Sequence, residues 1–192
     1  MSYHCCPLIA VGGYKRYMSM KTIILIGEAN TGKSRAIFEV VKTLWNINPT
    51  YEVIGAISSP ELFDGKGYAP NHSDLVTVFD VNGKRVLFVS ATDDSECINR
   101  LKNTLDELAQ KRYSIDILVT SCRRFDSEQF NLMVKTMNWN VRGRLLYDSG
   151  NEEIIQIPLL SVKYESAYND VVDWYNLLSA NLLTNVVLNE LK

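Results

Sequence analysis

The stretch that decides the fold is a short apolar run followed at once by a glycine-containing loop, Thr22-Ile23-Ile24-Leu25-Ile26-Gly27-Glu28-Ala29-Asn30-Thr31-Gly32-Lys33-Ser34. Residues 22–26 are β-branched or aliphatic, which is typical of a strand buried on both faces of a parallel sheet. Residues 34–45 then repeat apolar side chains at helical spacing, at Ile37, Val40, Val41 and Leu44. The stretch therefore predicts a strand, a tight loop and an amphipathic helix in succession.

The loop itself matches the pattern G-x-x-x-x-G-K-[ST] at every fixed position. Its glycines let the backbone wrap around a phosphate chain, and the N-terminus of the following helix adds positive potential. In such a loop Lys33 reaches the β- and γ-phosphates and the Ser34 hydroxyl ligates Mg²⁺. The alternative is a degenerate loop that keeps the fold without the ligand. The motif predicts that a nucleotide is held by Gly27, Glu28, Ala29, Asn30, Thr31, Gly32, Lys33, Ser34 and Arg35.

The rest of the chain alternates between strand and helix patterns. Asn82-Gly83 between two apolar runs predicts a hairpin, so one strand of the sheet should be antiparallel. Asp126 with Gln129 resembles a capping box at the start of a helix. The predicted strands cover residues 51–57, 75–79, 85–89 and 115–120, with one or two edge strands within 141–160. The predicted helices cover residues 95–111, 126–137 and 164–191, the last with a break near Ser179.

This alternation predicts an α/β fold with a mainly parallel sheet in a single three-layer domain over residues 20–192. Residues 1–19 differ in composition and precede Met20, so we expect a disordered N-terminal extension there. Residues 58–72 contain several Gly and Pro residues and predict a long loop, either a lid or a plain connector, with His72 a weak candidate base. Apolar positions of the last helix are expected to pack in the core rather than to form a partner groove, namely Val171, Trp174, Tyr175, Leu178 and Leu182.

Two acidic residues follow apolar runs and are candidates to hold Mg²⁺ opposite the loop. If residues 85–89 run parallel to residues 22–26, their carboxyl end lies beside the phosphates. Asp93 then lies on the metal side, whereas Asp80 lies in the hairpin turn at the opposite end. The alternative for Asp93 is to cap the next helix, a role that Asp94 or Ser95 can also fill.

Arg123 and Arg124 follow the strand at residues 115–120, at the same end of the sheet. A guanidinium there can bind a phosphate oxygen or stabilise charge that develops during transfer. Arg123 therefore joins Lys33 as a catalytic candidate, and the alternative is that both arginines are solvated loop residues. Cys122 is expected to be a buried, inert thiol.

These motifs resemble the P-loop NTPase superfamily, with Gly27–Ser34 as its Walker A motif. The hairpin before an acidic strand end also resembles the small GTPases, but residues 93–96 lack the glycine of D-x-x-G, and no N-K-x-D follows residues 115–120. The segments 86–93 and 116–123 make the chain similar to small uncharacterised bacterial P-loop proteins that are described only as nucleotide-binding. The resemblance implies a Rossmann-like P-loop fold that takes Mg²⁺ and ATP, with GTP less favoured.

Three functions remain open on the sequence. The leading hypothesis is Mg²⁺-dependent binding of a nucleoside triphosphate with slow hydrolysis, because no glutamate follows Asp93 to act as a base. The second is a small-molecule or nucleotide kinase. The third is a non-catalytic interaction module in which the nucleotide regulates an unidentified protein partner.

Composition bounds these hypotheses. The chain has 192 residues, 46% hydrophobic and 22% charged, with a net charge of −2. These values argue against disorder and give no sign of a basic nucleic-acid surface. The apolar runs are too short to span a bilayer. The four cysteines lack C-x-x-C spacing and there are only two histidines, so a zinc site is not predicted and we expect a cytoplasmic protein with reduced thiols.

Overall fold

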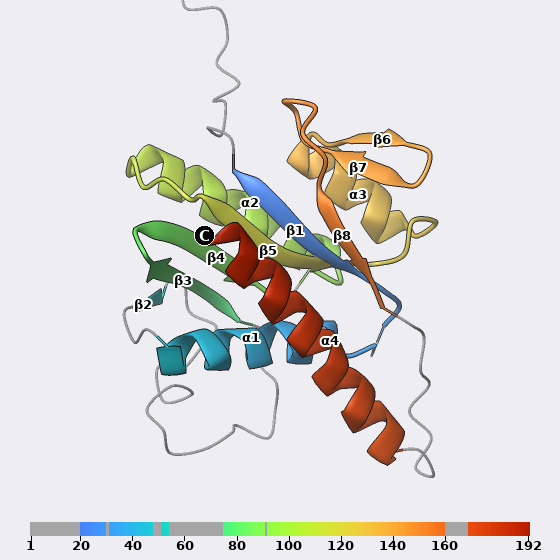
Figure 1. Ribbon diagram of the computed structural model, residues 1–192. Coiled ribbons are helices and arrows are strands. Elements are labelled where there is room, and N and C mark those ends of the chain that lie inside the picture. The colour runs from blue at the N-terminus through green and yellow to red at the C-terminus, as the bar shows by residue number, and fades with distance from the viewer. Residues whose placement is uncertain (1–19, 30, 48–50, 54–74, 91, 160–168) are drawn as a thin grey trace, which may run out of the picture.

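The computed structural model describes residues 20–29, 31–47, 51–53, 75–90, 92–159 and 169–192. Within them the chain forms a six-stranded sheet, a separate two-stranded hairpin and four helices (Figure 1). The predictions for residues 1–19, for Asn30, and for the loop at 58–72 with His72 lie outside the described residues.

The large sheet has the strand order β2-β3-β4-β5-β1-β8. Strands β4, β5, β1 and β8 pair in parallel, whereas β3 is antiparallel to both β2 and β4. The predicted α/β fold, mainly parallel with one antiparallel hairpin strand, is confirmed. The strands of this sheet are β1 (Lys21–Ile26), β2 (Tyr51–Val53), β3 (Val76–Val81), β4 (Lys84–Val89), β5 (Ile117–Cys122) and β8 (Ile155–Pro158).

The turn between β3 and β4 has the chemistry that the sequence predicts. Asn82 and Gly83 both adopt left-handed conformations, with φ of 55° and 78°. This pair of positive φ values is typical of the two-residue turn that suits the twist of a hairpin. The Asp80 carboxylate accepts a hydrogen bond of 3.2 Å from the Gly83 amide. Asp80 is therefore a turn residue, as predicted.

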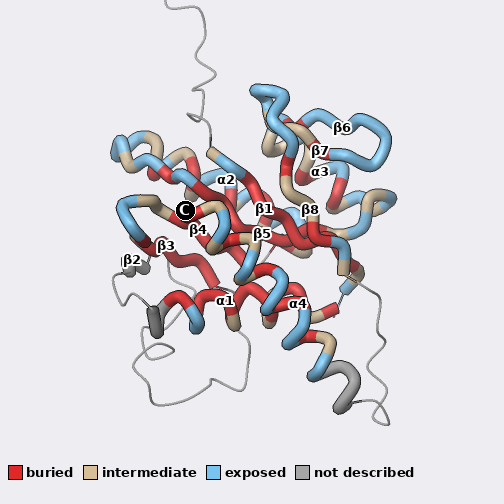
Figure 2. Tube along the Cα trace, in the orientation of Figure 1, coloured by how far each residue is buried: buried red, intermediate tan, exposed pale blue. Residues whose placement is uncertain are grey.

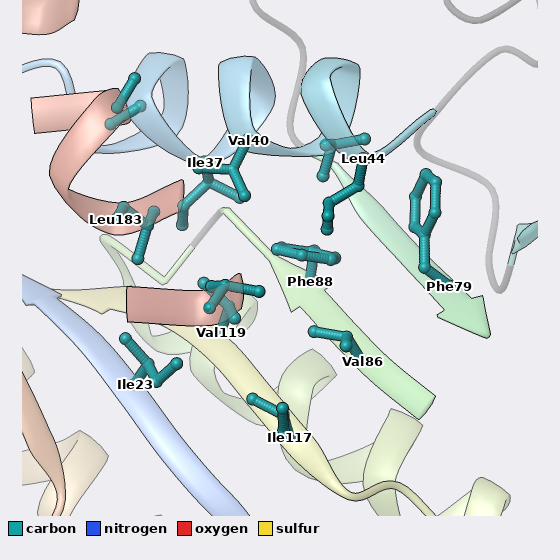
Figure 3. Close-up of a cluster of buried hydrophobic side chains, with 14 of the residues drawn as sticks. Ile23, Ile37, Val40, Leu44, Phe79, Val86, Phe88, Ile117, Val119 and Leu183 are labelled. Atoms are coloured by element: carbon teal, nitrogen blue, oxygen red, sulfur yellow. The ribbon is translucent and has the colours of Figure 1, made fainter. Parts of the chain in front are cut away.

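Two helices cover each face of the sheet. Helices α1 (Lys33–Ile47) and α4 (Asn169–Glu190) lie on one face, and α2 (Ser95–Gln110) and α3 (Glu128–Met137) lie on the other (Figure 1). Side chains of β1 alternate between the two layers, with Ile23 facing α1 and α4 (Figure 3) and Ile24 facing α2 and α3. Residues 23–26 of β1 are all apolar and are buried on both faces, as expected for a central parallel strand.

Two details of the helix predictions are wrong. Ser127, not Asp126, caps α3, since its hydroxyl accepts a hydrogen bond from the Phe130 amide. Helix α4 also runs without a break past Ser179, whose hydroxyl donates to the Tyr175 carbonyl at 2.9 Å. The Ser179 hydroxyl therefore binds a carbonyl of its own helix, and the helix continues to Glu190.

The outer side of α4 differs most from the sequence prediction. Trp174, Leu178 and Leu182, predicted in the core, are 64%, 50% and 52% exposed, and Figure 2 shows exposed segments along this helix. Tyr175 is half-buried, and the side chain of Val171 lies outside the described residues. The face of α4 that is buried against α1 and the sheet instead consists of Asn176, Ser179, Ala180, Leu183 and Val187.

The region after α3 forms more than edge strands. Strand β8 lies at the sheet edge beside β1, as predicted. The preceding residues form a separate antiparallel hairpin of β6 (Asn140–Arg142) and β7 (Leu145–Tyr147). Among the described residues, no helix is both long and apolar enough to cross a membrane.

Candidate functional site

The candidate site lies where three parallel strands end at one edge of the sheet. Ile26 at the end of β1 is in register with Cys122 at the end of β5, and Val89 at the end of β4 pairs with Thr120 of β5. The segments that follow these strands therefore meet above the sheet, which is where open α/β sheets bind ligands. The glycine-containing loop follows β1, Asp93 follows β4, and Arg123 follows β5.

The loop is fixed at its start by two neighbouring segments. The Gly27 amide donates to the Cys122 carbonyl at 3.1 Å, and the Leu159 amide donates to the Ile26 carbonyl at 2.7 Å. A Cβ on Gly27 would lie 2.6 Å from Oγ1 of Thr31 and 3.2 Å from Cβ of Leu159. Because no side chain fits there, the first glycine of the motif is required by packing.

The loop ends at the N-terminus of α1. Gly32 has a φ of 79°, a conformation that glycine adopts without strain. Its carbonyl accepts the hydrogen bond of the Ala36 amide at 2.8 Å, which begins the helix. The first turn of α1 contains no acidic residue. The amide groups of a first helical turn have no acceptor within the helix, and together with the helix dipole they favour an anion at this point.

Lys33 is the central cation of the site. Its side chain is only 3% exposed, and its ammonium lies 3.3 Å from Oδ1 of Asp93. The same Nζ donates to the carbonyls of Gly27 at 3.3 Å and Glu28 at 2.6 Å. Burial lowers the pKa of Lys33 from its ordinary value, while the Asp93 carboxylate acts in the opposite direction. The ammonium is thus held inside the loop by oxygen atoms.

Asp93 carries a second cation on the same oxygen, since Nε of Arg123 lies 3.3 Å from its Oδ1. Two positive charges therefore face one negative charge, and the cluster is left with positive charge in excess. The alternative role of Asp93 as a helix cap is wrong. Asp94 caps α2 instead, because its carboxylate accepts a hydrogen bond of 2.8 Å from the Cys97 amide.

Ser34 belongs to a group of hydroxyls beneath the loop that the sequence analysis did not identify. The Ser34 hydroxyl donates to the Ser90 carbonyl at 3.3 Å, and the Ser121 hydroxyl donates to the same carbonyl at 2.9 Å. The Thr92 hydroxyl donates to the Ser121 carbonyl. The first turn of α1 is thereby joined to the ends of β4 and β5. The signal in the sequence was the hydroxyl residues at the ends of two apolar runs.

The other residues that the sequence analysis singled out lie around the loop and at the end of β5. Arg124 forms an ion pair with Glu28 and lies 3.4 Å from the Asp126 carboxylate, and the hydrogen bond to Glu28 raises the pKa of Arg124. The Thr31 hydroxyl donates to the Glu28 carbonyl at 3.0 Å. Ala29 is exposed and Arg35 is half-buried. Cys122 is fully buried, and this burial raises the pKa of its thiol to about 12.

The donor set fits a magnesium ion that arrives with phosphate. Ser34 offers a hydroxyl at the start of α1, and Asp93 offers a carboxylate that contacts Lys33, the residue before Ser34. Hard oxygen donors, few in number, are the protein ligands that Mg²⁺ takes when phosphates and water complete its coordination. Among the described residues, no cluster of three or more His, Cys, Asp or Glu side chains forms a metal site.

A residue far along the chain also contacts the loop. Asn176 of α4 is only 3% exposed, and a Cβ on Gly32 would lie 2.0 Å from its Oδ1. Nothing local in the sequence predicts this contact, because the two residues come from opposite ends of the chain. No protein-family model, curated protein or solved structure matches the chain. Function is therefore inferred from the geometry of these residues.

Proposed function

We propose that the chain is a P-loop protein that binds a nucleoside triphosphate with Mg²⁺, ATP in preference to GTP, and hydrolyses it slowly. The observation that carries this proposal is the buried ammonium of Lys33. Lys33 lies at the start of α1, and its ammonium contacts two loop carbonyls and the Asp93 carboxylate. A buried ammonium is costly unless oxygen atoms surround it, and phosphate oxygens do so more strongly than carbonyls.

Binding exchanges one set of contacts for another. The β- and γ-phosphates enter between the loop amides, and Lys33 turns from the carbonyls of Gly27 and Glu28 to the phosphate oxygens. Ser34 and Asp93 would hold the Mg²⁺, whose charge would offset that of the phosphates. Asp93 gives up its contact with Lys33 in this exchange. The excess positive charge of the cluster favours this exchange in an anion's presence.

Slow hydrolysis follows from the roles of the nearby carboxylates. Asp93 holds two cations, Asp94 caps α2, and Glu28 pairs with Arg124. A general base has to accept a proton from the attacking water, and these carboxylates already bind other groups of the protein. Arg123 stabilises the charge that develops on the transferred phosphate. The pairing of Arg124 with two acidic residues weakens the kinase alternative, which relies on free arginines.

Thermal unfolding with nucleotides tests the proposal. Wild type, Lys33→Met and the control Lys42→Met are heated with ATP, GTP, ADP and GDP, each with and without Mg²⁺. Lys42 lies on the exposed side of the same helix. Ligand at 100 times its Kd stabilises the fold by about 2.7 kcal/mol. We expect this rise for Mg-ATP in wild type and Lys42→Met only. Phosphate release then measures turnover. No rise with any nucleotide in wild type would refute the proposal.

The outer side of α4 favours a second candidate, the nucleotide-regulated interaction module. Trp174, Leu177, Leu178 and Leu182 are all at least half exposed on this helix. Grouped exposed apolar side chains mark interaction sites more often than isolated ones do. This function predicts tight nucleotide binding without turnover, and association that differs between the triphosphate and diphosphate states. Equal association in both states would contradict it.

A further inference from the structure

Helix α4 contacts the loop through the buried amide of Asn176. Asn176 packs directly on Gly32, and the space between them is too small for a methyl group, since a Cβ would lie 2.0 Å from Oδ1. Gly32 immediately precedes Lys33, the residue that has to change partners when phosphate binds. A change in the loop backbone at Gly32 therefore has to be accommodated by Asn176.

The contact continues into the packing between two helices. Helix α1 starts one residue after Gly32, and Ala36 and Ile37 of α1 share a core with Ala180 and Leu183 of α4 (Figure 3). Close-packed side chains transmit a displacement rather than absorb it. The inner face of α4 is thus joined to the loop both by the amide contact and by the adjoining core.

We propose that Asn176 is a positioning residue that holds Gly32 in its anion-binding conformation and couples occupancy of the loop to α4. This inference rests on the proposed nucleotide binding. On α4 the polar Asn176 and Ser179 are buried, while the apolar Trp174 and Leu178 are exposed. A positioning role explains why Asn176 occupies a buried position where an apolar residue would pack.

Trp174 gives this coupling a spectroscopic readout. It lies two residues before Asn176 and its side chain is 64% exposed, so a change in the position of α4 alters its surroundings. The part of the emission change that disappears in Trp174→Phe belongs to this tryptophan. A merely structural role of Asn176 would not connect Mg-ATP with that signal.

The experiment titrates Mg-ATP into the full chain and follows both affinity and Trp174 emission. The variants are Asn176→Ala, the isosteric Asn176→Asp, and Ser179→Ala as a buried control on the same face whose hydroxyl bonds only within the helix. We expect Asn176→Ala to raise the Kd about tenfold and to lose the Trp174 response. Asn176→Asp should bind more weakly still, because its charge repels phosphate. Ser179→Ala should match wild type.

The outcomes separate the two levels of inference. If wild type neither binds nucleotide nor changes its Trp174 emission, the proposed function fails and the coupling fails with it. If wild type binds and both Asn176 variants keep its affinity and its Trp174 response, the coupling alone is overturned. Thermal unfolding without nucleotide shows whether Asn176→Ala folds. If it does not fold, Asn176→Leu, which has nearly the same size and carries no charge, decides the question by its Kd and its Trp174 response.

Discussion

At the scale of single residues, the charged groups of Lys33 and Asp93 have partners in this structure that a bound nucleotide and Mg²⁺ would replace in the proposed function. Lys33 holds loop carbonyls and Asp93 now, and phosphate oxygens can replace them. Asp93 holds Lys33 and Arg123, and Mg²⁺ can replace the first. The lowered pKa of Lys33 indicates that burial of its charge is only partly compensated by these oxygens. A bound anion would therefore stabilise the charged form of Lys33.

Gly32 allows the packing of the loop against α4 to be measured. Gly32 and Gly83 have nearly equal φ values, 79° and 78°, but a Cβ on Gly83 would meet nothing within 4 Å. Gly83→Ala should cost about 1–2 kcal/mol through backbone strain alone. Gly32→Ala adds the clash with Asn176 and should cost about 1–3 kcal/mol more. Urea unfolding of both variants checks this difference.

Adding Asn176→Ala to Gly32→Ala should recover about 1 kcal/mol, because the added methyl then has room. If Gly32→Ala and Gly83→Ala lower the free energy of unfolding by the same amount, the tight contact between Gly32 and Asn176 would be wrong.

Cys122 predicts a loss of stability at alkaline pH. Its pKa is raised to about 12 in the fold against an ordinary 9.0, so above pH 9 the unfolded chain loses the thiol proton and the folded chain keeps it. A group with a raised pKa stabilises the fold below its unfolded pKa, and this contribution falls by roughly 1 kcal/mol per pH unit above it. The fall should be visible between pH 9 and 10.5.

Urea unfolding of wild type and Cys122→Val over this range isolates the thiol, because other groups titrate alike in both proteins. The stability of wild type should fall more steeply with pH than that of the variant. Parallel curves would mean that the thiol is not buried as the structure has it.

At the scale of elements, the start of α2 separates two adjacent carboxylates. Asp94 caps the helix through the Cys97 amide, whereas Asp93 faces Lys33 and Arg123. Asp94→Ala should therefore cost about 1 kcal/mol of stability and leave nucleotide binding unchanged. Asp93→Ala should remove the Mg²⁺-dependent part of ATP stabilisation. Thermal unfolding of both variants with ATP, with and without Mg²⁺, checks the assignment. The reverse pattern would exchange the two roles.

The elements also show what sequence patterns can and cannot predict. Strand β1, helix α1 and the hairpin were predictable because local spacing and an Asn-Gly turn determine them. The meeting of Lys33 with Asp93 was predictable because parallel strands end at one edge. The outer face of α4 was mispredicted because an apolar stripe usually faces the core. The Asn176 contact joins residues distant in sequence, so no local pattern contains it. The hydroxyls beneath the loop do lie at the ends of two apolar runs, but the carbonyl that they bind is set by the pairing of distant strands.

At the scale of the whole molecule, α4 connects opposite ends of the sheet. Its Asn176 lies against the loop, while Glu190 near its other end accepts a hydrogen bond of 2.9 Å from Lys84 through its carbonyl and pairs with Lys21 at 2.6 Å. Lys21 begins β1, the strand that leads into the loop. The helix is therefore held at both ends of the strand that carries the site, and its outer side is exposed (Figure 2), including Trp174, Leu178 and Leu182.

This arrangement predicts self-association through α4. Residues 174–189 contain no charged side chain, so two copies can place these helices side by side without like-charge repulsion. Light scattering at increasing protein concentration should detect a dimer. Leu178→Lys, which places like charges at a symmetric contact, should weaken it at least tenfold, whereas the control Asn131→Lys, at an exposed position of α3 on the opposite face of the sheet, should have no effect. If α4 transmits the state of the loop, Mg-ATP should shift the dimerisation constant in wild type and not in Lys33→Met. A chain that stays monomeric at every concentration, with and without nucleotide, would leave the exposed leucines without this role.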